Sequence, residues 1–333
     1  MTANEIIKYK KILIIRLSSL GDILLTTPMI RALKNLNSSF EIDFLLKENY
    51  RDTLVYNPNL AELLILKSNS ENWNEIRKKI REKNYDLILD LQNNIRSFRL
   101  IWGLSCPKLK FRKYSFLKFL LVNFKYNLMK HLPQIAVRYS GVIEGLRLDA
   151  DGLDLISMNK PDESLFKLKI PIGICPGSRH FTKMWPKEYF IELADLLIQN
   201  GYDVILFGGE SDKQACYEIE SAVRGITNRC NDNQVLQTIA EMRLCKAIIC
   251  NDSGLMHTAC AAKVPVIALY GSTVKEFGFT PYKNKNLILE NNSLTCRPCS
   301  HIGRSGCPKQ HFKCMREIKP LQVFNSLKDF ISL

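Results

Sequence analysis

Residues 11–28 read KILIIRLSSLGDILLTTP, and this stretch decides the fold class that the sequence predicts. Residues 11–17 form a short, isoleucine-rich apolar run, which is typical of a buried strand in a parallel sheet. Gly21-Asp22 follows as a turn. Thr27-Pro28 then supplies a cap residue and a proline at the first helical position, so a helix is expected to about Asn37. This order of strand, turn and helix indicates an α/β unit.

The alternation continues through the first half of the chain. Strands are expected at 40–46, 63–66 and 85–91, with a charged surface helix at 71–83. Further helices are expected at about 94–104, 115–129 and 133–146. The pattern predicts a parallel sheet with helices on both of its faces.

A second series of the same kind begins at Ile172, after a segment rich in turn signals. The expected organisation is an N-terminal Rossmann-like domain (1–158), a linker (159–170), a C-terminal Rossmann-like domain (171–319) and a C-terminal helix (320–333). Ligands of open α/β sheets bind at the carboxyl ends of the strands, so a site is expected in a cleft between two facing domains.

The composition narrows the class of protein. The 333 residues are 46% hydrophobic and 24% charged, which argues against disordered, collagen-like and coiled-coil chains. No apolar run approaches the roughly 20 residues of a membrane span, and Arg16 closes the first apolar run too early for a signal peptide, so we expect a cytoplasmic protein. The net charge of +14 indicates an acidic partner, either nucleic acid, an anionic membrane surface or a phosphorylated substrate.

The basic residues are concentrated. Residues 91–143 contain ten Lys and Arg residues, interleaved with aromatic residues, and no Asp or Glu. Three interpretations are open: solvated helix faces, a surface for anionic lipid or a phosphorylated acceptor, and a nucleic-acid surface.

Two motifs combine a strand end with ionisable side chains. Asp22 follows a buried strand near a positive helix terminus, where a carboxylate can accept a proton from a substrate hydroxyl or merely satisfy backbone N–H groups. The loop 176–186, PGSRHFTKMWP, offers a glycine, hydroxyls and the cations Arg179 and Lys183 just before a helix. It suits a diphosphate, and the alternative is a solvated basic turn.

Two further motifs follow strands of the second half. In residues 250–257, CNDSGLMH, Asp252 or Ser253 is expected at a helix N-cap, whose free N–H groups either bind phosphate oxygens or are simply capped. For His257, the alternative to a role in ligand binding is a surface histidine in the first turn of the helix. Glu210 is expected either to hold ribose hydroxyls or to be a charged loop tip.

Taken in order along residues 11–320, the motifs resemble glycosyltransferase family 9, the ADP-heptose:lipopolysaccharide heptosyltransferases. The motifs that carry the resemblance are Arg16-x-Ser18-x2-Gly21-Asp22 with Thr27-Pro28, Pro176-Gly177-Ser178 with Lys183-x-Trp185-Pro186, Gly208-Gly209, and Asn251-Asp252-Ser253-Gly254-Leu255-x-His257. The resemblance implies a GT-B fold, with the acceptor on the N-terminal domain, the nucleotide-sugar on the C-terminal domain, and the C-terminal helix returning to the N-terminal domain. It also implies an inverting transfer without a catalytic metal.

The resemblance assigns roles to individual residues. Asp22 matches the general base, and Lys183 matches the lysine that contacts the donor phosphate. The other residues expected at the donor are Ser178, Glu210 (with Asp212 as the alternative), Asp252, Ser253, Gly254, Leu255 and His257. The basic residues expected at an anionic acceptor are Arg96, Arg99, Arg112 and Lys113.

The expected activity is transfer of a heptose or related sugar from an ADP-sugar to a lipopolysaccharide-core or related glycolipid, at the inner face of the cytoplasmic membrane. One alternative is another GT-B nucleotide-sugar enzyme, with a different donor or acting as an epimerase. The other is a basic nucleic-acid-binding protein with a zinc module. No nucleic-acid partner is expected, because the motifs follow strands as small-ligand sites do and no recognition helix is visible. The oligomeric state is left open.

Four of the 11 cysteines form a cluster, Cys296-x2-Cys299-x7-Cys307-x6-Cys314. Such a thiolate set is compatible with a structural zinc ion, and unbound or redox-paired thiols and an iron–sulfur cluster are the alternatives. No cofactor is expected for catalysis.

Overall fold

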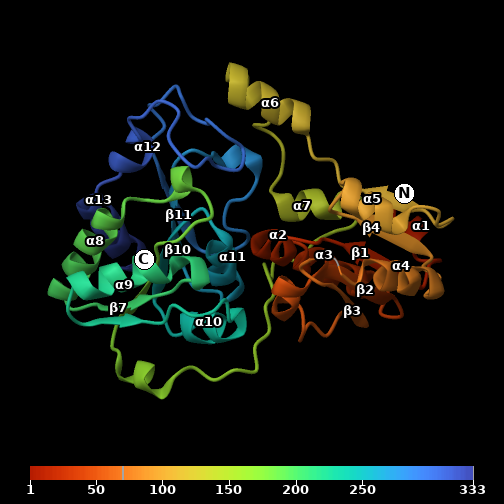
Figure 1. Cartoon of the computed structure of the whole chain (residues 1–333), viewed down its shortest axis with the longest axis horizontal. Helices are drawn as coiled ribbons and strands as arrows, with labels where there is room; N and C mark the ends of the chain where they lie inside the picture. The colour runs from red at the N-terminus through yellow and green to blue at the C-terminus, as the bar shows by residue number, and fades with distance from the viewer. Residues whose placement is uncertain (70, 333) are drawn as a thin grey trace. The chain divides into compact units, whose positions relative to one another are not determined.

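The computed structural model describes residues 1–69 and 71–332, and it consists of two compact units (Figure 1). The first unit comprises Met1–Lys113 with Pro133–Ile156, and the second comprises Tyr114–Leu132 with Ser157–Leu333. Each unit is built on one parallel sheet with helices packed against it. The prediction of two α/β domains is confirmed.

The first unit has five strands in the order β3-β2-β1-β4-β5. They are β1 (Lys11–Ile15), β2 (Glu41–Lys47), β3 (Glu62–Leu66), β4 (Leu87–Asp90) and β5 (Lys108–Lys110). The helices are α1 (Ala3–Ile6), α2 (Leu20–Leu24), α3 (Thr27–Leu36), α4 (Trp73–Glu82), α5 (Ile95–Ile101) and α7 (Ile135–Ser140), with a 3-10 helix η1 (Glu48–Thr53). β1 is central and buried from Ile12 to Ile15, as its apolar sequence predicts.

The second unit has six strands in the order β11-β10-β9-β6-β7-β8. They are β6 (Pro171–Cys175), β7 (Asp203–Leu206), β8 (Ile226–Asn228), β9 (Ala247–Asn251), β10 (Val266–Tyr270) and β11 (Asn286–Glu290). The helices are α6 (Ser115–Phe124), α8 (Lys187–Gln199), α9 (Lys213–Ala222), α10 (Val235–Met242), α11 (Gly254–Ala261), α12 (Lys313–Arg316) and α13 (Pro320–Ser332). Short 3-10 helices are η2 (Glu163–Lys167), η3 (Phe181–Lys183), η4 (Glu210–Asp212) and η5 (Lys275–Phe277).

The C-terminal helix differs from the expectation that it returns to the N-terminal domain. α13 packs against α8 within the second unit. Its buried residues Val323, Phe324 and Leu327 join the same apolar core as Phe190 and other residues of α8. Burial of this apolar stripe on a neighbouring helix is the physical reason for its position.

The segment 114–132 also lies in the second unit, which differs from the expected first domain of residues 1–158. Leu121 of α6 and Met129 form a small apolar cluster with Phe277. The ammonium group of Lys125 donates to the carbonyl of Pro298 at 2.7 Å. α6 ends at Phe124, before the expected residue 129, and Lys125 then adopts a left-handed backbone with φ of 61°.

Three short strands were not anticipated from the sequence: β5, β8 and β11. All three lie at sheet edges, where only one side is paired and the apolar pattern that marks a buried strand is weak. No helix among the described residues is long and apolar enough to cross a membrane.

Candidate functional site

Asp22 lies in the first turn of α2, directly after the central strand of the first unit. Its Oδ2 atom accepts hydrogen bonds from the Ser19 backbone N–H at 3.1 Å and from the Ser19 hydroxyl at 2.9 Å. Its Oδ1 atom lies 2.6 Å from Nη2 of Arg16 and accepts a hydrogen bond from the Tyr139 hydroxyl at 3.1 Å. The carboxylate does satisfy a backbone N–H, but two further side chains hold its other oxygen.

These contacts determine the charge of Asp22. Burial by itself would raise the pKa of Asp22, but the charge of Arg16 and the hydrogen bonds from Ser19 and Arg16 outweigh burial and hold the pKa below its usual value. The carboxylate is therefore ionised at neutral pH. Burial and the negative charge of Asp22 raise the pKa of Tyr139 well above its usual value, so the phenol stays neutral and donates its hydrogen bond.

Arg16 is itself held in place. Its Nη1 donates to the carbonyl of Leu91 at 2.9 Å, and its guanidinium lies over the Tyr139 ring at 5.6 Å. Neither Arg16 nor Tyr139 was assigned a role from the sequence. Arg16 could have been found from the sequence, because it belongs to the motif Arg16-x-Ser18-x2-Gly21-Asp22. Tyr139 is 117 residues from Asp22, and no local pattern connects the two.

The basic residues expected at the acceptor are placed differently from one another. Lys113 is half-buried, and burial and the charge of Arg16 lower its pKa, while the charges of Asp90 and Asp22 act in the opposite direction. Arg96 and Arg99 are exposed on α5, where the Arg99 guanidinium lies 5.9 Å from the centre of the Trp73 ring. Arg112 is exposed after β5. Their contact with an acceptor stays a prediction.

The second unit brings three loops together at the carboxyl ends of the neighbouring strands β6, β9 and β10. Nζ of Lys183 lies 2.7 Å from Oδ2 of Asp252, and the Thr273 hydroxyl donates to the same oxygen at 2.7 Å. The hydroxyl of Ser178 lies 3.4 Å from the Asp252 carbonyl. Lys183 and Asp252 are both largely buried, with side-chain exposures of 15% and 8%.

Asn251, the last residue of β9, forms hydrogen bonds with both ends of the loop 176–186. It was not assigned a role from the sequence. Its amide nitrogen donates to the carbonyl of Pro176 at 2.7 Å, and its Oδ1 accepts from the backbone N–H of Trp185 at 3.0 Å. The residue therefore positions both ends of the loop that carries Lys183.

The start of α11 offers unsatisfied donors. Ser253 precedes the helix with an extended backbone and makes no side-chain cap, and Gly254 is the first helical residue. The buried hydroxyls of Ser253 and Ser272 have no hydrogen-bond partner among the described residues. Free N–H groups at a helix start and unpartnered hydroxyls suit the oxygens of a phosphate group.

The remaining donor-site residues lie in different environments. Glu210 is exposed, whereas Asp212 accepts from the Gly209 backbone N–H at 2.9 Å and lies so close to Gly177 that a Cβ there would come 2.1 Å from its Oδ1. His257 is buried, which excludes the surface alternative. Leu255 is half-buried in the first turn of α11.

The four clustered cysteines are not disulfide-bonded. Burial raises the pKa of the Cys314 thiol to about 12 and also raises the pKa of Cys299. Sγ of Cys296 lies 3.8 Å from Nε2 of His311. Among the residues that the structure describes, no three or more His, Cys, Asp or Glu side chains form a group that could hold a metal ion, so the structure gives no support to a zinc site.

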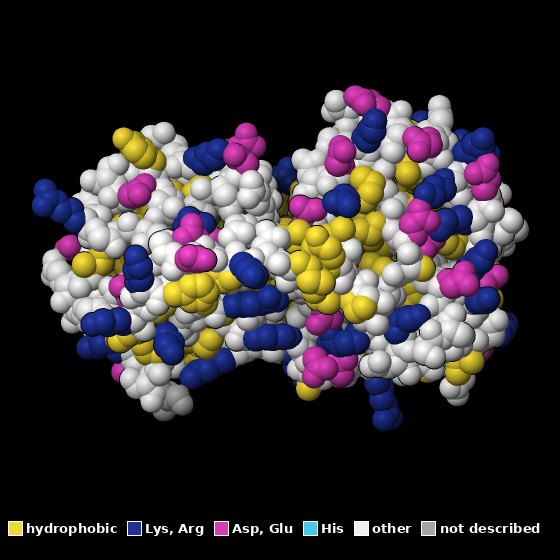
Figure 2. All heavy atoms as spheres, turned by 90° about the horizontal axis from the view of Figure 1, so that it is seen from below, with side chains coloured by type: hydrophobic (Ala, Val, Ile, Leu, Met, Phe, Trp, Pro, Cys, Tyr) yellow, Lys and Arg dark blue, Asp and Glu magenta, His cyan; other side chains and the backbone are white. Residues whose placement is uncertain are grey.

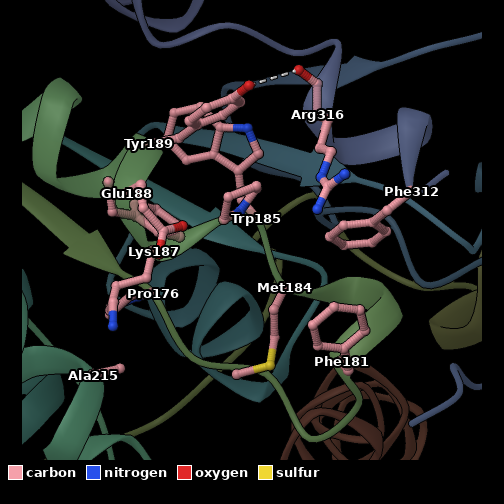
Figure 3. A pocket seen from close by; sticks show the side chains of 12 residues that line it. Pro176, Phe181, Met184, Trp185, Lys187, Glu188, Tyr189, Ala215, Phe312 and Arg316 are labelled. Carbon is pink, nitrogen blue, oxygen red and sulfur yellow. Dashed lines mark hydrogen bonds between the residues drawn. The ribbon is translucent and has the colours of Figure 1, made fainter. Parts of the chain in front are cut away.

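A separate pocket of about 470 Å³ is lined in part by residues of the loop 176–186 (Figure 3). Its walls are mainly apolar and aromatic, and include Phe181, Phe312 and Trp185. The Tyr189 hydroxyl donates to the carbonyl of Arg316 at its rim at 3.2 Å. Neither Lys183 nor Asp252 lines it, so it is not part of the charged loop cluster.

The comparisons with known proteins agree with the two-unit fold. The architecture of two parallel-sheet α/β units matches solved GT-B heptosyltransferases. One is the E. coli ADP-heptose lps heptosyltransferase II, with a TM-score of 0.71 and 26% identity over 96% of this chain and 98% of that one. Another is a family 9 glycosyltransferase from Veillonella parvula, with a TM-score of 0.76, 23% identity and 97% of each chain covered, which shows a shared fold.

The model of the family "Glycosyltransferase family 9 (heptosyltransferase)" matches residues 73–309. The protein therefore belongs to glycosyltransferase family 9. It is 31% identical to the lipooligosaccharide heptosyltransferase 2 of Campylobacter jejuni over 166 residues, 48% of this chain and 50% of that protein. It is 40% identical to the lipopolysaccharide heptosyltransferase 2 of Salmonella typhimurium over 122 residues, 35% of each chain. The chain thus spans half or less of the length of these curated relatives.

Proposed function

We propose that the protein is an inverting glycosyltransferase that moves a heptose or related sugar from an ADP-sugar to a hydroxyl group of a lipopolysaccharide-core or related glycolipid. The single observation that carries the proposal is the set of contacts by which Arg16, Tyr139 and Ser19 hold the carboxylate of Asp22. The names of the relatives support the choice of sugar and acceptor, since they are heptosyltransferases of lipopolysaccharide or lipooligosaccharide.

Asp22 serves as the general base in this proposal. The acceptor hydroxyl oxygen attacks the anomeric carbon, its proton passes to Asp22, and the bond from that carbon to the diphosphate oxygen breaks. Attack on the face opposite the leaving group inverts the configuration. A carboxylate with a lowered pKa is a weak base, so it accepts the proton only as the new carbon–oxygen bond forms and acidifies the hydroxyl. Arg16 and Tyr139 act as positioning residues.

The loop cluster of the second unit receives the departing diphosphate. Lys183, the N–H groups at the start of α11 and the hydroxyl of Ser253 are fixed donors that can stabilise the charge developing on the leaving oxygen. Asp252 keeps the ammonium group of Lys183 within the cluster before the donor binds. Donors supplied by the protein carry the charge in this proposal, without a catalytic metal ion.

The acceptor is proposed to be anionic. Lys113 lies within electrostatic range of Arg16 at the Asp22 group, and Arg96, Arg99 and Arg112 add exposed positive charge to the same unit. Phosphorylated sugars of a glycolipid would complement this charge.

Two measurements test the proposal in sequence. ADP-, UDP-, GDP- and CDP-sugars are compared by thermal shift, and ADP-heptose is expected to raise Tm most, because a ligand that binds only the folded state stabilises it. Wild-type protein and Asp22→Asn are then incubated with ADP-heptose and a lipopolysaccharide-core acceptor, and the product is followed by mass spectrometry. Stabilisation by a different nucleotide-sugar class, or equal product from the variant, would overturn the assignment.

A further inference from the structure

The segment 114–132 presents an unusual outer surface. Among the described residues, 20 large hydrophobic side chains are exposed, and five of these fall within residues 116–128. They are Phe116, Phe119, Phe124, Tyr126 and Leu128, with exposures from 52% to 69%. The rings of Phe119 and Phe124 lie 5.8 Å apart. Exposed apolar side chains gathered in this way mark a contact surface on a folded protein.

The inner side of the same segment is fixed to the second unit. Leu121 and Met129 are buried against Phe277, and Lys125 donates to the carbonyl of Pro298 at 2.7 Å. Asn127 donates to Oε1 of Glu276 at 3.1 Å. The outer aromatic face therefore remains directed away from the core to which the inner face is attached.

A second segment joins this surface. Residues 291–316 contain five Lys and Arg residues and no Asp or Glu, and residues 114–132 contain three lysines and no Asp or Glu. Lys125 connects the two segments through Pro298, and partial burial together with the charge of Lys118 lowers the pKa of His301. The loop 299–309 adds Ile302, whose side chain is 55% exposed, and Arg304, which is also exposed.

The carboxylates that border this surface are engaged on its inner side. Glu276 accepts the hydrogen bond from Asn127, and Glu290 forms an ion pair with Arg297 at 2.7 Å. Elsewhere the charges alternate: on the face drawn in Figure 2, Lys and Arg side chains are interspersed with Asp and Glu. The acid-free surface is thus a local feature.

We propose that this surface, made of the outer side of residues 114–132 and the loop 299–309, docks the protein on an anionic lipid bilayer. Phenylalanine, tyrosine and leucine side chains enter the interfacial region of a bilayer, while neighbouring lysines and arginines bind anionic headgroups. A second copy of the chain is a poorer partner, because two acid-free basic surfaces repel each other. The inference does not rest on the proposed sugar transfer.

The test is cosedimentation of the full-length protein with vesicles of two compositions, phosphatidylcholine alone and equimolar phosphatidylglycerol and phosphatidylcholine. The wild type is expected to prefer the anionic vesicles. Phe116→Ser combined with Phe119→Ser should weaken binding to them at least about tenfold, because two aromatic side chains no longer enter the bilayer. Lys130→Glu should weaken it about fivefold to tenfold, and this loss should disappear at high salt.

Phe166→Ser is the matched control, since Phe166 is 63% exposed in η2 of the same unit and lies outside this surface. Its vesicle binding should stay within about twofold of the wild type. All variants should keep the wild-type Tm and ADP-heptose binding, which separates this test from the proposed reaction. Equal binding to both vesicle compositions, or unchanged binding of the double variant, would overturn the inference. So would loss of a dimer or of RNA binding in the double variant without any change in vesicle binding.

Discussion

Asp22 in the first unit and Asp252 in the second have closely similar surroundings. Each follows a central strand at the turn into a helix. Asp22 pairs with Arg16 at 2.6 Å and accepts a hydrogen bond from Tyr139 at 3.1 Å. Asp252 pairs with Lys183 at 2.7 Å and accepts one from Thr273 at 2.7 Å. Each carboxylate therefore has a cation and a hydroxyl from a distant residue as partners, and Asp22 also accepts from the backbone N–H and the hydroxyl of Ser19.

The difference lies in the cation. Arg16 is anchored to the Leu91 carbonyl and to the Tyr139 ring, so it holds Asp22 in a fixed orientation. Lys183 carries a single ammonium group on a flexible chain, which can exchange a carboxylate for a phosphate oxygen. We therefore assign the reactive role to the carboxylate in the first unit and to the cation in the second.

Asp22→Asn tests this assignment most severely. The amide cannot accept the proton, so kcat should fall at least about 100-fold while ADP-heptose binding stays unchanged. Asp154→Asn is the control, because Asp154 also pairs with an arginine, Arg31, in the first unit. The control should retain its kcat. If both variants lost the same activity, the loss would reflect damage to an ion pair and not removal of a base.

Lys183→Ala should weaken ADP-heptose binding roughly 10- to 100-fold, because the phosphate loses its cation and Asp252 is left unpaired. Binding is measured by calorimetry. Lys187→Ala removes a nearby lysine that pairs with Glu218, and it should bind the donor normally. A donor affinity for Lys183→Ala equal to that of the wild type would contradict the exchange of Asp252 for phosphate.

Arg16→Gln should change the pH profile. In the wild type the pKa of folded Asp22 lies below its unfolded value, so its stabilising contribution is present above about pH 4 and is lost as the pH falls through the folded pKa. Without Arg16, burial dominates and raises that pKa. The acid limb of kcat/KM should move to higher pH, and the stability deficit of the variant should be larger at pH 7 than in acid. Arg16→Lys should restore part of both. An unmoved acid limb would exclude Arg16 as the group that sets the charge of Asp22.

Tyr139→Phe should have a smaller effect. It removes one hydrogen bond to Oδ1 of Asp22 and leaves the ring that packs against Arg16 and Phe111. The expected decrease in kcat is about threefold to tenfold, with a slight shift of the acid limb to higher pH. A loss as large as that of Asp22→Asn would show that Tyr139 takes part in the reaction itself.

Treatment with excess chelator should produce the smallest effect. Lys183 and the start of α11 are proposed to carry the charge of the diphosphate, so the rate of sugar transfer should be unchanged after EDTA. A loss of activity that magnesium restores would contradict the proposed role of these residues.

The central strands were predictable because the features that mark them lie within a few neighbouring residues of the sequence. β1 and β9 are short apolar runs followed by turn residues, and the polar motifs come directly after them. The edge strand β5, with the sequence Lys-Leu-Lys, carries no such run and was missed. The positions of α6 and α13 were also not predictable, because an amphipathic helix specifies which of its faces is buried but not the surface against which that face packs.

The sequence by itself determined two α/β series and the places of Asp22, Lys183 and Asp252 at strand ends, since periodicity and turn chemistry act over a few neighbouring residues. Only the tertiary structure decided the distant partners of these residues. Tyr139 reaches Asp22 from α7, which packs against α3. Lys183 reaches Asp252 because the neighbouring parallel strands β6 and β9 bring their following loops to one edge of the sheet. The burial that acts to raise the pKa of Asp22 comes from the packing of the whole unit, whereas Arg16 and Ser19, which oppose burial and lower that pKa, are near Asp22 in the chain.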